Sequence, residues 1–387
     1  MTMETNHNGN NTTLASSPQH GLLLIVIPDF EAPLGDTCSS IHQALGLVDR
    51  LTIVVSVQDT ASFTSTNNSN SNSNSNNNCN GSVTGAGGAG GVGGKGRASF
   101  HSVQKVLSAL YVSFTKQAVA LGRPLAELDI VIRESCGYDV GAGGESEDIP
   151  FNVFLGLPPV LKELEILNQK RLQNGSKPLA IRTLDEAKAH ATGESHIPLV
   201  QAIDSALPHT NVQEGQFGDV ALGGTFDHLH AGHKILLSMT AWISSHRVVC
   251  GVTDDAMLKT KKFKEFMEPL NKRIDAVERF LRIFKRGLVY EVVPISDMYG
   301  PTITDDKLEA LMVSKETLKG GGMVNQERAN RSLPPLTIEV INVISPTETQ
   351  VDEVSLKISS TFIRQYLSEQ AQKSVEHPAA ASTAGAY

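Results

Sequence analysis

The sequence predicts an α/β protein with a Rossmann-like open parallel sheet at its C-terminal end, preceded by a smaller α/β domain. From Phe217 onward, short apolar segments alternate with segments of helical period, the pattern of a parallel sheet with crossover helices. A length of 387 residues is enough for two ordinary domains. The composition, with 40% apolar and 19% charged residues, is typical of a globular chain with a sizeable core.

The domain plan follows from shifts in composition along the chain. An Asn/Ser run, Thr66–Asn80, precedes a Gly-rich run, Gly81–Gly96, and neither has enough apolar side chains to order itself. The stretch 168–216 is polar and rich in Gly and Pro, so we expect the boundary within it, near Thr210. The predicted plan is a disordered tail at 1–20, an N-terminal α/β domain of unknown role at 21–200 with a low-complexity insertion at 62–97, a C-terminal α/β domain at 212–372, and a disordered tail at 373–387.

Individual elements are expected where apolar residues recur with strand or helix period. The predicted strands are Leu22–Ile27, Leu51–Val57, Leu128–Arg133, Asp219–Leu222, Arg247–Thr253, Leu288–Ile295, Leu308–Val313 and Thr337–Ile344. A helix is expected from Ser102 to about Leu121. Three further helices are expected to bury one face each: Ile235, Met239, Trp242 and Ile243; Ile274, Val277, Leu281 and Phe284; Phe362, Ile363, Tyr366 and Leu367.

Charge and cysteine content narrow the class of partner. A formal net charge of −8 without a long Lys/Arg block argues against nucleic acid or an anionic membrane as the main partner. The four cysteines lie far apart, which predicts neither a disulfide framework nor a thiolate zinc site. No apolar run is long enough for a membrane span or a signal peptide. We therefore expect a cytoplasmic protein that acts on small molecules.

Two helix starts carry residues suited to phosphate chemistry. The strand expected near residue 222 ends in the run GGTFDHLHAGH, residues 223–233, and a helix follows at once. Glycines let the backbone approach a phosphate, and a helix N-terminus beginning near His230 attracts anions. His230 and His233 lie three apart and face one side, where imidazoles can stabilise charge on a phosphoryl group.

The second helix start lies near the C-terminus, in the segment KISSTFIR at residues 357–364. Its Ser and Thr hydroxyls can cap a helix and contact phosphate, and Arg364, one turn in, supplies a cation. Two phosphate-binding helix starts in one domain fit a triphosphate.

These two segments resemble the (H/T)xGH and ISSTxxR motifs of the HxGH nucleotidyltransferase superfamily. Three further segments, DMYGPT at 297–302, VSKET at 313–317 and GMVNQER at 322–328, resemble the eukaryotic and archaeal branch of phosphopantetheine adenylyltransferases. Cytidylyltransferases of the superfamily usually carry Arg-Thr-x-Gly before Ile-Ser-Thr, where this chain has EVSL at 353–356, so adenylyl transfer is favoured. No Gly-Lys-Ser/Thr loop follows Arg364, so the chain resembles the monofunctional, fungal-like form without a dephospho-coenzyme A kinase.

The resemblance implies a reaction and a set of site residues. ATP and 4′-phosphopantetheine would give dephospho-coenzyme A and pyrophosphate, with Mg²⁺ accompanying ATP and no metal site in the protein. The expected catalytic residues are His230, His233 and Lys259. The expected nucleotide-binding residues are Gly224, Thr225, Phe226, Asp227, Ser359, Ser360, Thr361 and Arg364. The expected phosphopantetheine-binding residues are Lys261, Ser314, Lys315, Glu316, Thr317, Asn325 and Arg328.

Several alternatives stay open at this point. His228, His230 and His233 have a spacing that also suits zinc or a purely structural role. Asp227 is equally suited to capping the following helix. The catalytic lysine is one of Lys259, Lys261, Lys262 and Lys264. The function alternatives are a cytidylyltransferase acting on a phosphorylated alcohol, and a non-catalytic scaffold that binds other coenzyme A pathway enzymes. A separate activity in the N-terminal domain is a third.

Overall fold

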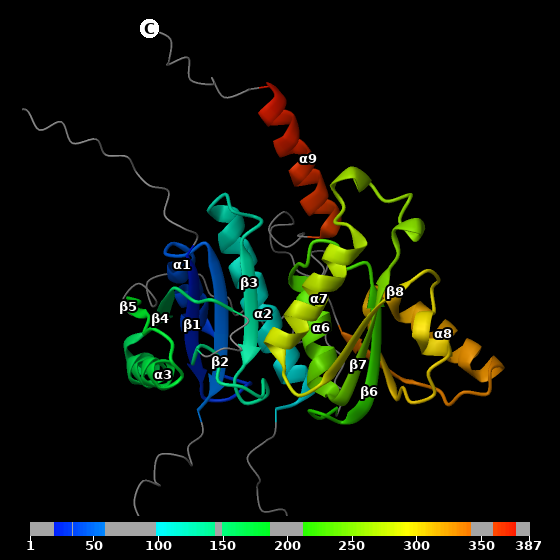
Figure 1. The fold of residues 1–387 in the computed structure, drawn as a ribbon, viewed down its shortest axis with the longest axis horizontal. Helices are drawn as coiled ribbons and strands as arrows, with labels where there is room; N and C mark the ends of the chain where they lie inside the picture. Colours follow the sequence, from blue (N-terminus) through cyan, green and yellow to red (C-terminus); the bar gives the residue numbers. More distant parts are fainter. Residues whose placement is uncertain are drawn as a thin grey trace, which may run out of the picture.

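The computed structural model confirms the predicted α/β class, with two five-stranded, entirely parallel sheets (Figure 1). The structure describes residues 19–32, 34–58, 98–143, 149–185, 212–341 and 359–376. The predicted insertion, the boundary near Thr210 and most of both predicted tails lie outside these residues. Below, the N-terminal half means the described residues up to 185, and the C-terminal half means those from 212 onward.

The first sheet lies in the N-terminal half and has the order β3-β2-β1-β4-β5. Its strands are β1 (His20–Ile27), β2 (Arg50–Val57), β3 (Glu127–Ile132), β4 (Val153–Gly156) and β5 (Ala180–Thr183). Helices α1 (Gly35–Leu45), α2 (Phe100–Ala120) and α3 (Leu161–Gln173) accompany it. Strands β1 to β4 are almost wholly buried, which explains their near-continuous apolar runs.

Sequence patterns missed α1, β4, α3 and β5 in this half. Strand β5 lies at the sheet edge and is mostly exposed, and only three residues of α3 are buried, so neither element has a clear apolar pattern. The expected boundary region, 168–216, therefore begins inside α3. Helix α2 starts before Ser102 because Ser99 forms a capping box in which Ser102 is the third helical residue.

The second sheet has the order β10-β9-β6-β7-β8. Its strands are β6 (Phe217–Gly224), β7 (Ser244–Thr253), β8 (Val289–Ile295), β9 (Ala310–Ser314) and β10 (Thr337–Ile341). Its helices are α6 (Ala231–Ile243), α7 (Leu270–Phe284), α8 (Leu318–Asn330) and α9 (Ser360–Glu376). Helix α9 extends four residues beyond the predicted domain end at 372, and α8 was not predicted, because its start contains three consecutive glycines.

The predicted helix faces agree with the structure except on α9. Ile235, Met239, Trp242 and Ile243 are buried on α6, and Val277, Leu281 and Phe284 are buried on α7. On α9, Ile363 is buried, but its buried neighbours are the polar residues Arg364 and Ser368. That helix faces a polar site rather than the core.

The two halves share one hydrophobic core. Residues of α2 and of α6 belong to the same buried cluster, and Phe100 of α2 meets Trp242 of α6 with ring centroids 6.4 Å apart. A second contact lies at the far end of α7, where the Tyr138 hydroxyl donates to the Ile283 carbonyl at 2.5 Å. The C-terminal half therefore folds against the N-terminal half, with α2 beside α6 (Figure 1).

In the part of the chain that the structure describes, no helix is both long and apolar enough to span a membrane.

Candidate active site

A cavity of about 270 Å³ opens at the carboxyl ends of β6, β7, β8 and β9. The chain enters the sheet at β6, builds outward to β8, and then returns to β9 on the other side of β6. Such a reversal leaves a crevice where open α/β sheets bind ligands. Gly223, Gly224 and Gly251 form part of the wall, and Met298 and Met312 add apolar surface.

The turn after β6 is held in an unusual backbone conformation. Phe226 and His228 both lie in the left-handed region, with φ of 50° and 47°, which is costly for residues with a side chain. The Phe226 ring is fully buried, and a Cβ on Gly224 would lie 3.1 Å from it. Gly224 therefore lets the strand pass close to that ring, and the ring anchors the turn.

His230 and His233 form a stacked pair at the start of α6. His230 is the N-cap residue, and its ring centroid lies 3.9 Å from that of His233, with 25° between the planes. Phe226 packs on His233, with centroids 5.3 Å apart. Both imidazoles are half-buried, and their Nδ1 atoms are buried with no hydrogen-bond partner. Only the Nε2 side of each ring can therefore meet a ligand.

Burial also sets the charge of this pair. Desolvation, helped by nearby His228 and Lys234, lowers the pKa of His230 to about 4. Burial and the neighbouring His230 lower the pKa of His233 well below its usual value. Both rings are therefore neutral near pH 7, where each can donate one hydrogen bond through an Nε2–H group to an anionic ligand.

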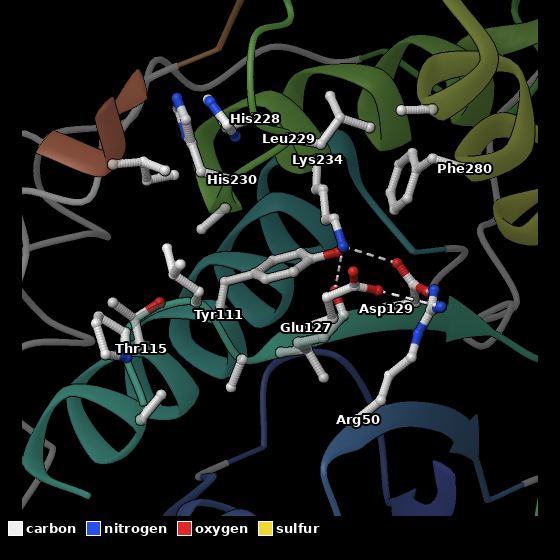
Figure 2. Close-up of a pocket in the computed structure, with 18 of the residues that line it drawn as sticks. Arg50, Tyr111, Thr115, Glu127, Asp129, His228, Leu229, His230, Lys234 and Phe280 are labelled. Atoms are coloured by element: carbon white, nitrogen blue, oxygen red, sulfur yellow. Dashed lines mark hydrogen bonds and ion pairs between the residues drawn. The ribbon is translucent and has the colours of Figure 1, made fainter. Parts of the chain in front are cut away.

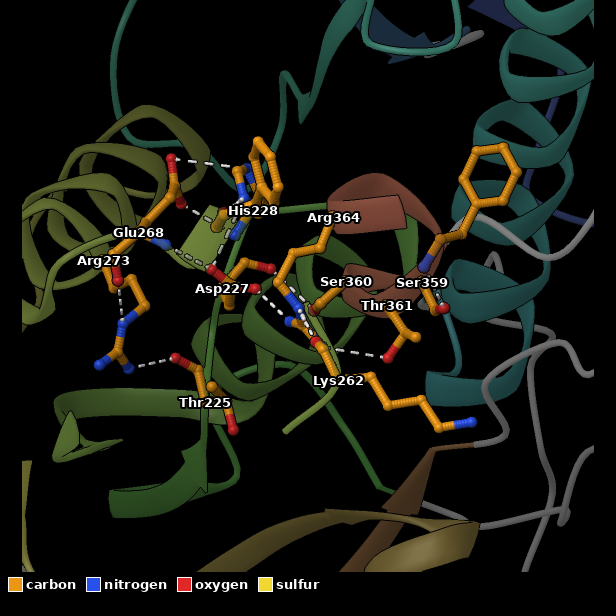
Figure 3. A network of polar contacts seen from close by, with 12 residues as sticks. Thr225, Asp227, His228, Lys262, Glu268, Arg273, Ser359, Ser360, Thr361 and Arg364 are labelled. Carbon is orange, nitrogen blue, oxygen red and sulfur yellow. Dashed lines mark hydrogen bonds and ion pairs between the residues drawn. The ribbon is translucent and has the colours of Figure 1, made fainter. Parts of the chain in front are cut away.

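A buried ion pair joins the two predicted motifs (Figure 3). Asp227 is fully buried, and its carboxylate accepts a hydrogen bond from the Arg364 guanidinium, which also donates to the Lys262 carbonyl and the Thr361 hydroxyl. The Ser360 hydroxyl donates to the Asp227 carbonyl at 2.8 Å. Asp227 thus does not cap α6, and Arg364 fastens α9 to the turn instead of presenting its cation openly.

Arg273 is a site residue that sequence reasoning missed. Its side chain is fully buried on α7 and donates to the carbonyls of Thr225, Thr253 and Glu268 at 2.7, 2.8 and 3.0 Å. It thereby holds the ends of β6 and β7 together. The available signal was a cation on the apolar face of a helix, four residues before Val277.

His228 serves the loop before α7. Its Nε2 donates to the Phe266 carbonyl at 2.8 Å, and its backbone N–H donates to Glu268 at 2.8 Å. Its ring therefore binds the loop before α7 and does not join the His230–His233 pair. Among the described residues, no group of three or more His, Cys, Asp and Glu side chains is arranged to hold a metal ion.

The lysines of this loop point into solvent. Lys259, Lys261, Lys262 and Lys264 all have exposed side chains, between the end of β7 and the start of α7. Exposure leaves them free to approach a bound phosphate, and it does not distinguish between them. The assignment of Lys259 as catalytic and of Lys261 as substrate-binding stays a prediction.

The residues predicted to bind phosphopantetheine separate into two groups. Ser314 and Thr317 line the cavity at the end of β9, where the Ser314 amide donates to the Thr317 hydroxyl at 3.0 Å, while Lys315 and Glu316 between them are exposed. Asn325 instead pairs both ways with the backbone of Leu336, at 2.9 and 2.8 Å.

Arg328 belongs with Asn325, outside the cavity. It is fully buried and donates to the carbonyls of Thr302, Asp305 and Pro334 at 2.5, 2.9 and 2.6 Å. Neither Asn325 nor Arg328 lines the cavity. The structure gives both a local structural task, which is to fix the connection from α8 to β10.

Comparison with known proteins places residues 221–366 in a cytidylyltransferase-like family. A phosphopantetheine adenylyltransferase of Saccharomyces cerevisiae is 42% identical over 178 residues, which are 44% of this chain and 58% of that protein. The uncharacterized protein C1F12.08 of Schizosaccharomyces pombe is 46% identical over 155 residues, 40% of this chain and 49% of that protein. This chain therefore spans about half the length of these two relatives.

An archaeal relative is matched almost throughout. The phosphopantetheine adenylyltransferase of Methanopyrus kandleri is 39% identical over 149 residues, 38% of this chain and 90% of that protein. A crystal structure of a protein with unknown function from Archaeoglobus fulgidus is 33% identical and matches 32% of this chain and 89% of its own, with a TM-score of 0.29.

Proposed function

This chain belongs to the phosphopantetheine adenylyltransferase family, and we propose that it transfers the adenylyl group of ATP to 4′-phosphopantetheine in coenzyme A biosynthesis. The products are dephospho-coenzyme A and pyrophosphate. The observation that carries this proposal is the stacked His230–His233 pair, held at the N-terminus of α6 in the turn after β6, the strand whose end lines the cavity. We assign the reaction to the domain at residues 212–372.

The reaction is a phosphoryl-type displacement at the α-phosphorus of ATP. An oxygen of the phosphopantetheine phosphate forms the new O–P bond, and the bond from the α-phosphorus to the bridging oxygen breaks, so pyrophosphate carries the electron pair away. A phosphate monoester has a second pKa of about 6 and is mostly dianionic at neutral pH. No general base is needed, and the protein contributes alignment and charge stabilisation.

The histidines supply the charge stabilisation. As neutral rings with buried Nδ1 atoms, they offer Nε2–H donors to oxygens of the transferred phosphate. The free N–H groups at the start of α6 face the same anion. The exposed Lys259 and Lys261 add positive charge from the facing loop. Ser359 and Thr361, at the start of α9, are our proposed contacts to the nucleotide.

The cavity suits the second substrate. Pantetheine is a slender chain with alternating apolar and amide groups, and the cavity combines glycine backbone, methionine side chains and the hydroxyls of Ser314 and Thr317. We therefore propose that the pantetheine arm lies along β6 and β9, with its phosphate directed toward His230. Asn325 and Arg328 support this wall indirectly.

The nucleotide enters as its complex with a divalent cation, which we take to be Mg²⁺. That ion prefers phosphate oxygens and water over a dedicated protein cage. We also propose a cytoplasmic location, because the three cysteines among the described residues, Cys38, Cys136 and Cys250, are free thiols.

Pyrophosphate release by the purified full chain tests this function. ATP and CTP are each offered with 4′-phosphopantetheine, glycerol 3-phosphate or phosphoethanolamine, in the presence of Mg²⁺. Release with ATP and phosphopantetheine alone is the expected result. Release with CTP and another phosphate ester would instead assign a cytidylyltransferase, and no release with any pair would remove the catalytic proposal.

A further inference from the structure

A buried lysine ties the helix that carries the histidine pair to the N-terminal half. Lys234 follows His233 on α6, and its backbone N–H donates to the His230 carbonyl at 3.0 Å, closing the first turn. Its ammonium group lies 5.5 Å from the centroid of the Phe280 ring on α7 and reaches across to the N-terminal half. It donates to the Leu128 carbonyl at 2.6 Å and to the Asp129 carboxylate at 2.8 Å, both on β3.

The receiving carboxylate is built into the first sheet. Asp129 is 2% exposed, and its second oxygen accepts from Arg50 of β2 at 2.8 Å. Burial alone would raise the pKa of Asp129, yet the facing cations Lys234 and Arg50 hold it below its usual value. The carboxylate is therefore charged and fixed between one cation from each half.

The histidine turn borders a cavity on this side. A cavity of about 490 Å³ separates the two halves there, and His230, Ala231 and Lys234 form part of its wall (Figure 2). A turn that borders a cavity gains few packing contacts from the atoms opposite it. The Lys234–Asp129 pair crosses from one wall to the other and is a charged link between β3 and the turn.

We infer that Asp129, a residue of the N-terminal half, is a positioning residue for the His230–His233 pair and acts through Lys234. The inference rests on the proposed function, because it assigns Asp129 a part in that reaction. It also gives the N-terminal half a task. The half does not contribute a reacting group, and it fixes the helix turn on which the reacting groups lie.

Two variants separate positioning from folding. Asp129→Asn removes the charge and keeps the shape, and we expect kcat to fall by about 10- to 100-fold while KM for both substrates changes by less than about threefold. The double variant Asp129→Leu/Lys234→Met removes both charges of the Lys234–Asp129 pair and leaves Arg50 its ion pair with Glu127 at 3.1 Å, so it should fold about as stably as the wild type. Its kcat should nevertheless stay as low as that of the single variant.

Tyr138→Phe is the matched control, because it removes another hydrogen bond between the halves, at Ile283 and away from the histidines. It should keep the wild-type kcat. A folded double variant with wild-type kcat would overturn the inference, and so would a Tyr138→Phe variant as slow as Asp129→Asn. Either result would leave the proposed function intact.

A measurement that does not depend on turnover tests the inference even if the proposed function is wrong. If the wild type transfers no adenylyl group, ¹³C-labelled histidine side chains are followed by NMR, with His230→Gln and His233→Gln used for assignment. The signals of His230 and His233 should move in the double variant and stay in place in Tyr138→Phe. Unmoved signals in the double variant would overturn the inference.

Discussion

The two halves repeat one sheet topology and differ in the turn that follows its central strand. With strands counted in chain order, both sheets run third, second, first, fourth, fifth. In each half the first strand is followed by a turn and a helix, α1 or α6. A phenylalanine precedes the helix N-cap by four residues in both turns: Phe30 before Leu34, and Phe226 before His230.

The chemistry of the two turns is different. Leu34 and Thr37 stand in the N-terminal half where His230 and His233 stand in the other. Glu31 is exposed and pairs loosely with Lys105, at 3.4 Å, whereas the corresponding Asp227 is fully buried against Arg364. The same topology thus places a turn after the first strand in both halves, and the two turns carry different side chains; we propose that only the second turn binds phosphates.

The largest difference between the two turns is expected in how much each carboxylate pair contributes to the free energy of unfolding. Asp227→Ala leaves the Arg364 cation buried and unpaired, which should lower the free energy of unfolding by about 3–5 kcal/mol. Glu31→Ala removes an exposed pair and should change it by less than about 0.5 kcal/mol. Urea denaturation of both variants measures this, and equal losses would show that the two turns are held alike.

The next contrast concerns turnover. His233→Ala removes a donor to the transferred phosphate and should lower kcat by about 10²-fold or more, while Thr37→Ala should leave kcat unchanged. Steady-state kinetics with ATP and phosphopantetheine, on variants shown to be folded by circular dichroism, gives the answer. An unaffected kcat in His233→Ala would exclude the histidine from the mechanism.

Adjacent glycines give a smaller effect within the active turn. In Gly224→Ala the new methyl group would lie 3.1 Å from the Phe226 ring, an overpacking that should cost about 1–3 kcal/mol of stability. Gly223→Ala is the control, because its nearest neighbour lies at 3.7 Å, an ordinary contact. Thermal denaturation should show a lower Tm for the first variant alone, and a comparable loss in both would mean that the ring does not anchor the turn.

The smallest difference is expected in the pH dependence of the free energy of unfolding, to which a buried histidine of each half should contribute similarly. Burial lowers the pKa of His20 in one half and of His230 in the other to about 4, whereas an unfolded histidine titrates near 6.5. Between pH 6.5 and 4 the unfolded chain binds protons that the folded chain does not. Stability should therefore fall as the pH falls through this window, by at most about 1.4 kcal/mol per pH unit for each histidine.

Replacement of either histidine tests this directly. His20→Gln and His230→Gln should each flatten the pH dependence of the free energy of unfolding between pH 7 and 4.5. A slope that both variants leave unchanged would show that these rings have the same pKa in the folded and the unfolded chain.

Local sequence patterns predicted the fold class and the position of the histidine turn, because both depend on neighbours along the chain. The run from Gly223 to His233 falls at the end of β6 as expected. Contacts between residues far apart in the sequence could not be predicted from local patterns. The pairings of Asp227 with Arg364 and of Lys234 with Asp129 join segments more than 100 residues apart. No local period predicts them.

The structural contacts of Arg273, Asn325 and Arg328 could not be predicted for a related reason. Each satisfies backbone carbonyls or amides of another element, and such a task leaves no signature beyond a polar residue inside a helix. Exposed elements such as β5 and α3 escaped prediction because their burial, and hence their apolar pattern, is slight.

Both halves have the same sheet topology, but only the C-terminal half is proposed to bind a nucleotide. Calorimetric titration of the full chain with ATP and Mg²⁺ tests this most directly. We predict one nucleotide bound per chain, with affinity lost in His233→Glu, where a carboxylate repels the phosphates, and kept in Thr37→Glu. Two nucleotides per chain, or binding that is lost in Thr37→Glu and kept in His233→Glu, would contradict it.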